Sequence, residues 1–333
     1  MKRSICVICG LLALQLVALA QEQQFANLGN LKLQNGGVIR NCRIGYRTFG
    51  TLNSDKSNVI VFPTWAGGTT EQLKSNFGPG RLIDSTSYFV VAIDALSNGV
   101  SSSPSNSRLQ PRMRFPEFSL RDTVESQHEL LTRVLNIHRV KAVVGISMGG
   151  MQVFQWLVSY PDFMEKAIPI VGSPRLAPYD LMLWQAQIDA LMRDRDWKGG
   201  NYSVNSSRAL DFAFGELLLT TPTDYNRRKT REQVFADLAK AQNDAHRFDA
   251  NDKIRQVQAM MKLDISLESA AKTVKAKVFV VVAKYDHVVT PGPATEFARL
   301  LGATFLELDS DCGHLATSCE SRRLNEAVAT FLK

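Results

Sequence analysis

One serine in the middle of the chain stands in a pattern that presents a nucleophile. Ser147 lies in Gly145-Ile146-Ser147-Met148-Gly149, a G-x-S-x-G motif. A β-branched apolar run, 141–145, precedes it, and an apolar helical pattern over Met151–Ser159 follows. This strand–turn–helix context is the one that the motif requires. The N-terminus of the helix favours negative charge beside the serine. We therefore interpret Ser147 as the nucleophile of an acyl-transfer reaction.

A serine hydroxyl attacks a carbonyl well only when a base takes its proton and an acid orients that base. Asp286 lies three residues after the apolar run Val278–Ala283. His314 is the histidine that follows the last such run, Thr304–Leu308. The order Ser, Asp, His is typical of enzymes whose nucleophile sits on a strand-to-helix turn. The sequence predicts a catalytic triad of Ser147, Asp286 and His314.

Acyl transfer also needs two N–H donors for the oxygen that becomes negative. We expect one to be the backbone N–H of Met148, the residue after the nucleophile. The second is expected in the loop 63–68, which follows the strand pattern Asn58–Phe62 and contains Gly67 and Gly68. Glycines let the backbone approach a substrate closely. We assign this second donor to the backbone N–H of Trp65.

Strand and helix patterns alternate along most of the chain. The predicted buried strands are Asn58–Pro63, Tyr88–Asp94, Lys141–Gly145, Ala167–Val171, Val278–Ala283 and Thr304–Leu308. A helical pattern over Leu120–Leu135 separates two of them. Around Asn35-Gly36-Gly37, the segments Leu31–Leu33 and Val38–Phe49 indicate a β-hairpin. Alternation of strands and helices indicates an α/β protein with a mostly parallel sheet and helices on both faces. With the serine turn, this predicts the α/β-hydrolase fold.

The interval 172–271 interrupts this alternation. It has helical patterns over Leu181–Arg193, Arg208–Leu218 and Arg231–Lys240, with no convincing strand. We predict that 172–271 is a helical cap inserted into a core domain formed by 21–171 and 272–333.

The N-terminus has the pattern of an export signal. Lys2 and Arg3 precede the apolar stretch Ile5–Leu19, and small residues surround a cleavage point after Ala20. We predict a signal peptide over 1–20 and a secreted or periplasmic protein with no membrane span after cleavage. The formal net charge is +7. The sequence lacks the clustered basic and aromatic residues of a nucleic-acid groove, which argues against nucleic-acid binding.

Three of the five cysteines lie after the predicted signal. An oxidising compartment permits a disulfide among Cys42, Cys312 and Cys319. Cys312 and Cys319 flank His314 and are close in sequence, so they are the favoured pair. Their bridge would fix the histidine loop. Three unpaired, buried cysteines remain the alternative.

Beyond these features, the sequence resembles the homoserine O-acetyltransferase family of α/β-hydrolase-fold enzymes. The segments that carry the resemblance are Tyr46–Asn53, Phe115-Pro116, Arg121-Asp122, Gly145–Gln152, Trp156, Tyr160-Pro161 and Asp196–Tyr202. They are spread along nearly the whole mature chain. The resemblance implies a serine that is acetylated by acetyl-CoA and passes the acetyl group to homoserine. It supports the triad and the two N–H donors named above, and it implies a homodimer formed through the cap.

Two positions depart from the family pattern. Leu315 follows His314 where the family has an aspartate that binds the homoserine amine. An ungapped count places Ile188 where the family has an arginine for the homoserine carboxylate; Arg193 or Arg195 could take this role only if the count is wrong. Isoleucine cannot form a charge-assisted pair.

The export signal would also separate the enzyme from cytosolic acetyl-CoA. We therefore expect hydrolysis of a small-acyl ester or related acyl compound, without cofactor or metal. The alternative is an acyl-CoA-dependent O-acyltransferase.

Overall fold

The computed structural model describes residues 22–203, 215, 217–243 and 248–333, so the predicted signal peptide 1–20 lies outside the described residues. An eight-stranded sheet forms the centre, in the order β1-β2-β4-β3-β5-β6-β7-β8. The strands are β1 Gln24–Lys32, β2 Val38–Phe49, β3 Val59–Pro63, β4 Phe89–Ile93, β5 Val140–Ile146, β6 Met164–Ile170, β7 Lys277–Ala283 and β8 Thr304–Leu308. From β4 to β8 all neighbours pair in parallel. The predicted α/β class and mostly parallel sheet are confirmed.

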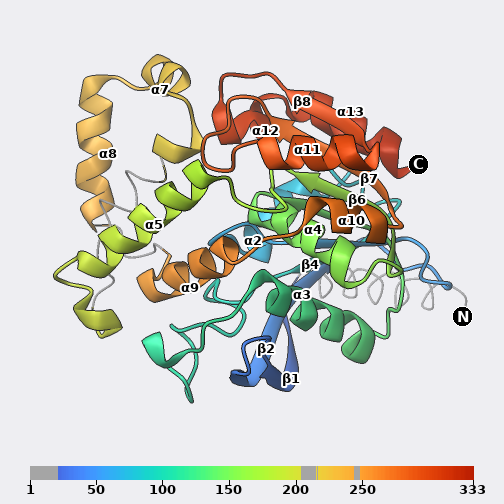
Figure 1. Ribbon diagram of the computed structural model, residues 1–333, viewed down its shortest axis with the longest axis horizontal. Helices are drawn as coiled ribbons and strands as arrows, with labels where there is room; N and C mark the ends of the chain where they lie inside the picture. Colours follow the sequence, from blue (N-terminus) through green and yellow to red (C-terminus); the bar gives the residue numbers. More distant parts are fainter. Residues whose placement is uncertain (1–21, 204–214, 216, 244–247) are drawn as a thin grey trace, which may run out of the picture.

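Helices cover both faces of the sheet (Figure 1). One face carries α3 Leu120–Glu129, α4 Met148–Ser159, α10 Leu267–Thr273 and α11 Gly292–Leu301. The other carries α2 Thr70–Leu73, the 3-10 turn η1 Lys74–Asn76 and α13 Ser321–Leu332. In β3, Val59 and Val61 pack toward the first face, whereas Ile60 and Phe62 pack toward the second. A strand buried on both sides has a continuous apolar sequence, which is why these strands could be predicted.

The N-terminal hairpin is longer than predicted. β1 begins at Gln24, and the predicted segment Leu31–Leu33 covers only its end and the start of the turn. Register shifts around Gly29 break the regular alternation of buried and exposed residues. The buried Leu28 and Leu31 are therefore three residues apart, which hid the strand from a pattern of period two.

The helix predicted over Leu120–Leu135 is α-helical only to Glu129 and continues as a π-helical turn, η3 Leu130–Val134. Its start is fixed by a capping box, in which the Ser119 side chain accepts from the Asp122 N–H and the Asp122 carboxylate accepts from the Ser119 N–H. The remaining short turns are η2 Arg112–Arg114, η4 Lys198–Gly200, η5 Gly313–Leu315 and α12 Ala316–Cys319.

Between β6 and β7 the chain forms α5 Pro178–Arg193, α7 Pro222–Arg228, α8 Arg231–Asn243 and α9 Ala250–Met261. Figure 1 shows α5, α7 and α8 projecting to one side of the sheet. The helix predicted over Arg208–Leu218 falls largely outside the described residues. The predicted boundary at residue 271 falls inside α10, which packs against α4 and α11. The cap domain over 172–271 stays a prediction.

No helix in the described part of the chain has the length and apolar character needed to cross a membrane.

Candidate active site

Ser147 occupies the sharp turn between β5 and α4. Its backbone has φ 60° and ψ −123°, a conformation that L-residues rarely adopt. The flanking glycines leave room for this turn. A Cβ on Gly145 would lie 2.4 Å from the carbonyl carbon of Gly149, and one on Gly149 would lie 2.7 Å from the Pro63 oxygen. The strand, the helix and the loop after β3 can therefore come this close at Ser147 only because positions 145 and 149 are glycines.

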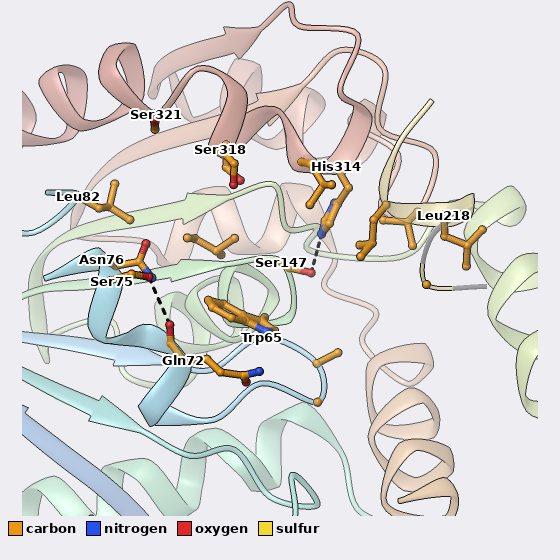
Figure 2. A pocket seen from close by; sticks show the side chains of 18 of the residues that line it. Trp65, Gln72, Ser75, Asn76, Leu82, Ser147, Leu218, His314, Ser318 and Ser321 are labelled. Carbon is orange, nitrogen blue, oxygen red and sulfur yellow. Dashed lines mark hydrogen bonds between the residues drawn. The ribbon is translucent and has the colours of Figure 1, made fainter. Parts of the chain in front are cut away.

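The three residues predicted as a triad come together in the structure. His314 Nε2 lies 2.8 Å from Ser147 Oγ, and His314 Nδ1 lies 2.5 Å from Asp286 Oδ2 (Figure 2). The carboxyl ends of parallel strands lie at one edge of a sheet, so the loops after β5, β7 and β8 converge. Asp286 and His314 are both buried. This geometry permits a proton to pass between the hydroxyl and the imidazole.

The loop that carries Asp286 is held by the first turns of α5. Asp286 Oδ1 accepts from the N–H groups of Val288 and Val289, each at 3.0 Å. Trp184 Nε1 donates to the Val288 carbonyl at 2.9 Å, and the Asp180 carboxylate accepts from the Thr290 hydroxyl at 3.0 Å. Burial raises the pKa of Asp180. Asp180 could not be recognised from the sequence because it lies 110 residues before Thr290, which it holds.

A buried side-chain network joins the nucleophile turn to the loop after β3. Gln152 Nε2 donates to the carbonyl oxygens of Thr64 and Met148, each at 3.0 Å. Gln127 donates to Gln152 Oε1 at 2.6 Å and accepts from Trp156 Nε1 at 2.8 Å. Gln152 thus fixes two peptide groups. One is that of Thr64, directly before the predicted donor N–H of Trp65, and the other is that of Met148, directly after Ser147.

The two predicted donor N–H groups belong to Trp65, which directly follows Thr64, and to Met148, so both lie at or next to residues that Gln152 binds. Within the described residues, neither the Trp65 nor the Met148 backbone N–H donates to a protein acceptor. Both groups are therefore available to a ligand, and the N-terminal end of α4 adds its dipole at the same place.

A cavity of about 1250 Å³ lies beside Ser147 and is lined by Trp65, His314 and Leu315, among others. Leu315 therefore faces the site, as the sequence analysis assumed. The assumption was wrong for Ile188, which is only 3% exposed in the hydrophobic core and is not among the lining residues. On α5 the cavity is lined instead by Leu183, Trp184 and Gln187. The next position along a helix points about 100° away, which directs Ile188 into the core.

The alternative placed a cap arginine at the acceptor side. Arg193 and Arg195 are exposed at the end of α5 and beyond it, and neither is among the lining residues. Among the described residues, the lysine and arginine side chains that line the cavity are those of Arg81, Lys253 and Arg322.

Cys312 and Cys319 form a disulfide, whereas Cys42 is free and buried. The favoured pairing is confirmed, and the alternative of three unpaired cysteines is wrong. The bridge spans η5 and α12, so it brackets the turn that carries His314. Burial raises the pKa of Cys42 to about 12, so its thiol is not a nucleophile at neutral pH.

Two carboxylates, Asp224 and Asp311, lie close to Cys312. Arg227 pairs with both carboxylates, at 2.8 Å each. The Cys312 sulfur is already bonded to Cys319. The two carboxylates are therefore paired with Arg227, and the Cys312 sulfur is in a disulfide. We interpret the group as an ion-pair cluster that supports the histidine loop.

Comparison with known proteins decides the family. A family described as "alpha/beta hydrolase fold" matches residues 58–317. The chain is a member of the alpha/beta hydrolase fold family. The predicted fold is thereby confirmed.

Relatives within this family include both enzyme types that the sequence suggested. The chain is 37% identical to a probable esterase of Corynebacterium glutamicum over 55% of its length, and spans about half (54%) of that relative. It is 29% identical to an ethyl acetate hydrolase of Pseudomonas veronii, over 88% of this chain and 89% of that protein. It is 30% identical to a homoserine O-acetyltransferase of Chlorobaculum tepidum, over 93% and 94%. The predicted resemblance to this transferase family is confirmed.

Among solved structures, the acetyl esterase MekB superposes with a TM-score of 0.87 at 26% identity, covering 94% of this chain and 97% of that one. The chain is thus an enzyme of the hydrolase fold with esterases and O-acetyltransferases as relatives.

Proposed function

We propose that the protein hydrolyses small-acyl esters through an acyl-enzyme on Ser147, with His314 as base and Asp286 as its orienting acid. The observation that carries the proposal is the hydrogen-bonded chain from Ser147 Oγ through His314 to Asp286, at 2.8 and 2.5 Å. Its position beside a cavity and the esterase names of several relatives support it.

The reaction begins when Ser147 Oγ attacks the ester carbonyl and its proton passes to His314 Nε2. Asp286 keeps the imidazole in the required orientation and stabilises its positive charge. The oxyanion accepts hydrogen bonds from the N–H groups of Trp65 and Met148. His314 then gives its proton to the leaving alkoxide, and the alcohol departs. Water attacks the acyl-enzyme while His314 takes one of its protons. His314 then returns this proton to Ser147 Oγ as the second intermediate collapses, which releases the acid and the free serine.

Water is the proposed acceptor because the two homoserine-binding residues expected from the family pattern are not found among the described lining residues, although Arg81, Lys253 and Arg322 also line the cavity. Leu315 is apolar, and neither Arg193 nor Arg195 is among the lining residues. Transfer from an acyl-CoA to an alcohol is the second candidate, and the similarity to a homoserine O-acetyltransferase favours it.

One experiment separates these two candidates. The purified protein is supplied with p-nitrophenyl acetate, and separately with acetyl-CoA and homoserine. We expect nitrophenol release with no O-acetylhomoserine detected by mass spectrometry. Efficient homoserine acetylation would overturn hydrolysis as the function.

We further propose export to an oxidising compartment, with cleavage after Ala20. The Cys312–Cys319 disulfide supports it, since such bridges persist chiefly outside the cytosol. N-terminal sequencing of the mature protein from its source cells tests the cleavage point. A mature chain that retains residues 1–20 would contradict it.

A homodimer through the cap helices is also proposed. The large apolar side chains exposed there support it: Tyr179 and Phe235 are each 57% exposed, and Met182 is 74% exposed. Light scattering at several protein concentrations measures the mass, and a monomer at every concentration would contradict the proposal.

Gln152→Leu is expected to lower kcat for p-nitrophenyl acetate about tenfold with little change in KM. The substitution preserves bulk but removes the bonds to the Thr64 and Met148 carbonyls and leaves Gln127 without its acceptor. The Thr64 carbonyl and the Gln127 amide both lose a partner, at a cost of about 1–3 kcal/mol each, so the free energy of unfolding is expected to fall by at least about 2 kcal/mol.

Gln155→Leu on the same helix is the control, because the Gln155 amide bonds only Ser159 within the described residues. Steady-state kinetics and urea denaturation of both variants measure these effects. Equal kcat for the two variants would show that Gln152 does not position the site.

A further inference from the structure

The cavity beside Ser147 has two chemically different arms. The apolar arm lies under the cap helices. Most of its lining is apolar, from Leu183, Trp184, Leu218, Val257, Met260 and Val288, and the polar residues there are Gln187, Lys253 and Gln256. The polar arm lies on the other side of Ser147, between the α2–η1 segment and the start of α13. Its polar lining residues are Gln72, Ser75, Asn76, Thr317, Ser318 and Ser321, and the apolar Leu82 and Leu324 line it as well. Figure 2 shows Asn76, Gln72 and Ser318 on the far side of Trp65 and Ser147 from Leu218.

The polar arm holds hydrogen-bonding groups that the protein does not use. Within the described part of the chain, the side chains of Asn76, Ser318 and Ser321 have no protein hydrogen-bond partner. In the Gln72 side chain, the amide oxygen accepts from the Thr69 N–H at 2.9 Å, and the amide nitrogen has no acceptor among the described residues. Amides and hydroxyls both donate and accept, so this set matches a ligand that does the same at several neighbouring atoms.

The structure of this arm is held in place from outside. Asn325 Nδ2 on α13 donates to the Gly80 carbonyl at 3.2 Å, which joins α13 to the loop after η1. The two walls of the arm are therefore linked across their outer end. Arg81 and Arg322 also line this side of the cavity and add guanidinium donors at its exposed rim.

The place of the arm in the chain fixes which part of an ester it meets. Leu315, Thr317 and Ser318 follow His314 within two turns, so the arm begins beside the imidazole that gives its proton to the leaving oxygen. The alcohol of the ester leaves from that oxygen. Gln72, Ser75, Ser318 and Ser321 are exposed, so water solvates them in the absence of a ligand. An alkyl alcohol would gain no hydrogen bonds from these groups, whereas a polyhydroxylated alcohol would pair with them.

Size points the same way. The volume of about 1250 Å³ exceeds the roughly 300–1000 Å³ typical of small-ligand pockets. A short-chain alkyl ester would occupy only a small part of it. We infer that the polar arm binds a hydroxyl-rich alcohol of the sugar class, whose short-acyl ester is cleaved at Ser147. This inference rests on the proposed ester hydrolysis and specifies its leaving group.

The test compares 6-O-acetylglucose with butyl acetate as substrates. Wild-type kcat/KM is expected to be at least about tenfold higher for the sugar ester. Asn76→Leu and Ser318→Leu are each expected to lower the ratio of the two kcat/KM values about tenfold, since each removes hydrogen bonds to hydroxyls. Asn226→Leu adds the same side chain at an exposed position of α7 outside the cavity lining and is expected to keep the ratio within about twofold.

Free glucose provides a measurement that does not depend on any variant. It is expected to inhibit p-nitrophenyl acetate hydrolysis competitively and more strongly than butanol at equal concentration. Turnover of butyl acetate without preference for the sugar ester, or a ratio unchanged in both arm variants, would overturn the inference and leave ester hydrolysis standing. A wild-type protein inactive on p-nitrophenyl acetate and on both other esters would overturn the proposed function and the inference with it.

Discussion

Ser147→Gly and Ser147→Ala are both expected to lower kcat for ester hydrolysis at least about 10⁴-fold, since both remove the nucleophile. Their stabilities are expected to differ. Alanine keeps the unfavourable backbone conformation of φ 60° and ψ −123°, whereas glycine adopts it without a Cβ penalty. That penalty is about 1–3 kcal/mol, and glycine returns about 0.5–1 kcal/mol through the entropy of the unfolded chain. The glycine variant is therefore expected to be about 1 kcal/mol more stable.

Ser126 provides the matched control for this pair. It is buried inside α3, where its backbone is helical, so Ser126→Gly is expected to be about 1 kcal/mol less stable than Ser126→Ala. Urea denaturation of the four variants measures both differences, and a fluorophosphonate probe reports the reactive hydroxyl. Retention of more than about 1% of kcat in Ser147→Ala would contradict the nucleophile assignment. The same sign at both positions would show that the turn is unstrained.

The second large effect is expected at Gly145. In Gly145→Ala, the new Cβ would lie 2.4 Å from the carbonyl carbon and oxygen of Gly149. Both contacts are to backbone, so either β5 or α4 must move. Overpacking against atoms that cannot rotate away is expected to lower the free energy of unfolding by about 3 kcal/mol. The shift of Ser147 from His314 is expected to lower kcat about 100-fold.

Gly292→Ala separates this clash from a general effect of losing a glycine. No atom lies within 4 Å of the Cβ that would be added at Gly292, in the first turn of α11. The free energy of unfolding of Gly292→Ala is expected to rise by about 0.4–1 kcal/mol, because alanine restricts the unfolded chain. Thermal unfolding and p-nitrophenyl acetate kinetics of the two variants test the contrast. Unchanged activity in Gly145→Ala would show that the turn tolerates displacement.

The parts of the site that could be predicted from sequence are those whose signals are local. Ser147 is recognised by its immediate neighbours, and Asp286 and His314 by their distance after apolar runs that had to be buried strands. Their roles stay predictions, but the structure places them within hydrogen-bonding distance. The strands themselves were visible because burial on both faces leaves a continuous apolar sequence.

What could not be predicted depends on contacts between distant segments. Asp180 and Trp184 hold the Asp286 loop from α5, which precedes β7 in the chain, and no spacing rule connects them to that loop. The placement of Ile188 at the acceptor side was wrong for a related reason. Counting residues along the chain locates a position on the helix to within about one residue. Which neighbouring side chain enters the cavity depends on how the helix is rotated against the core, and here Gln187 lines the cavity whereas Ile188 is buried.

The bridge between Cys312 and Cys319 has a consequence for how the protein is produced. It closes a short loop around His314 and lies apart from the strands that build the sheet. Material made in a reducing cytosol is therefore expected to show the same far-ultraviolet circular dichroism as oxidised material. Active-site titration is expected to count fewer competent molecules, because only the histidine turn would be loosened. For this protein, a folded preparation and a fully active one need not be the same.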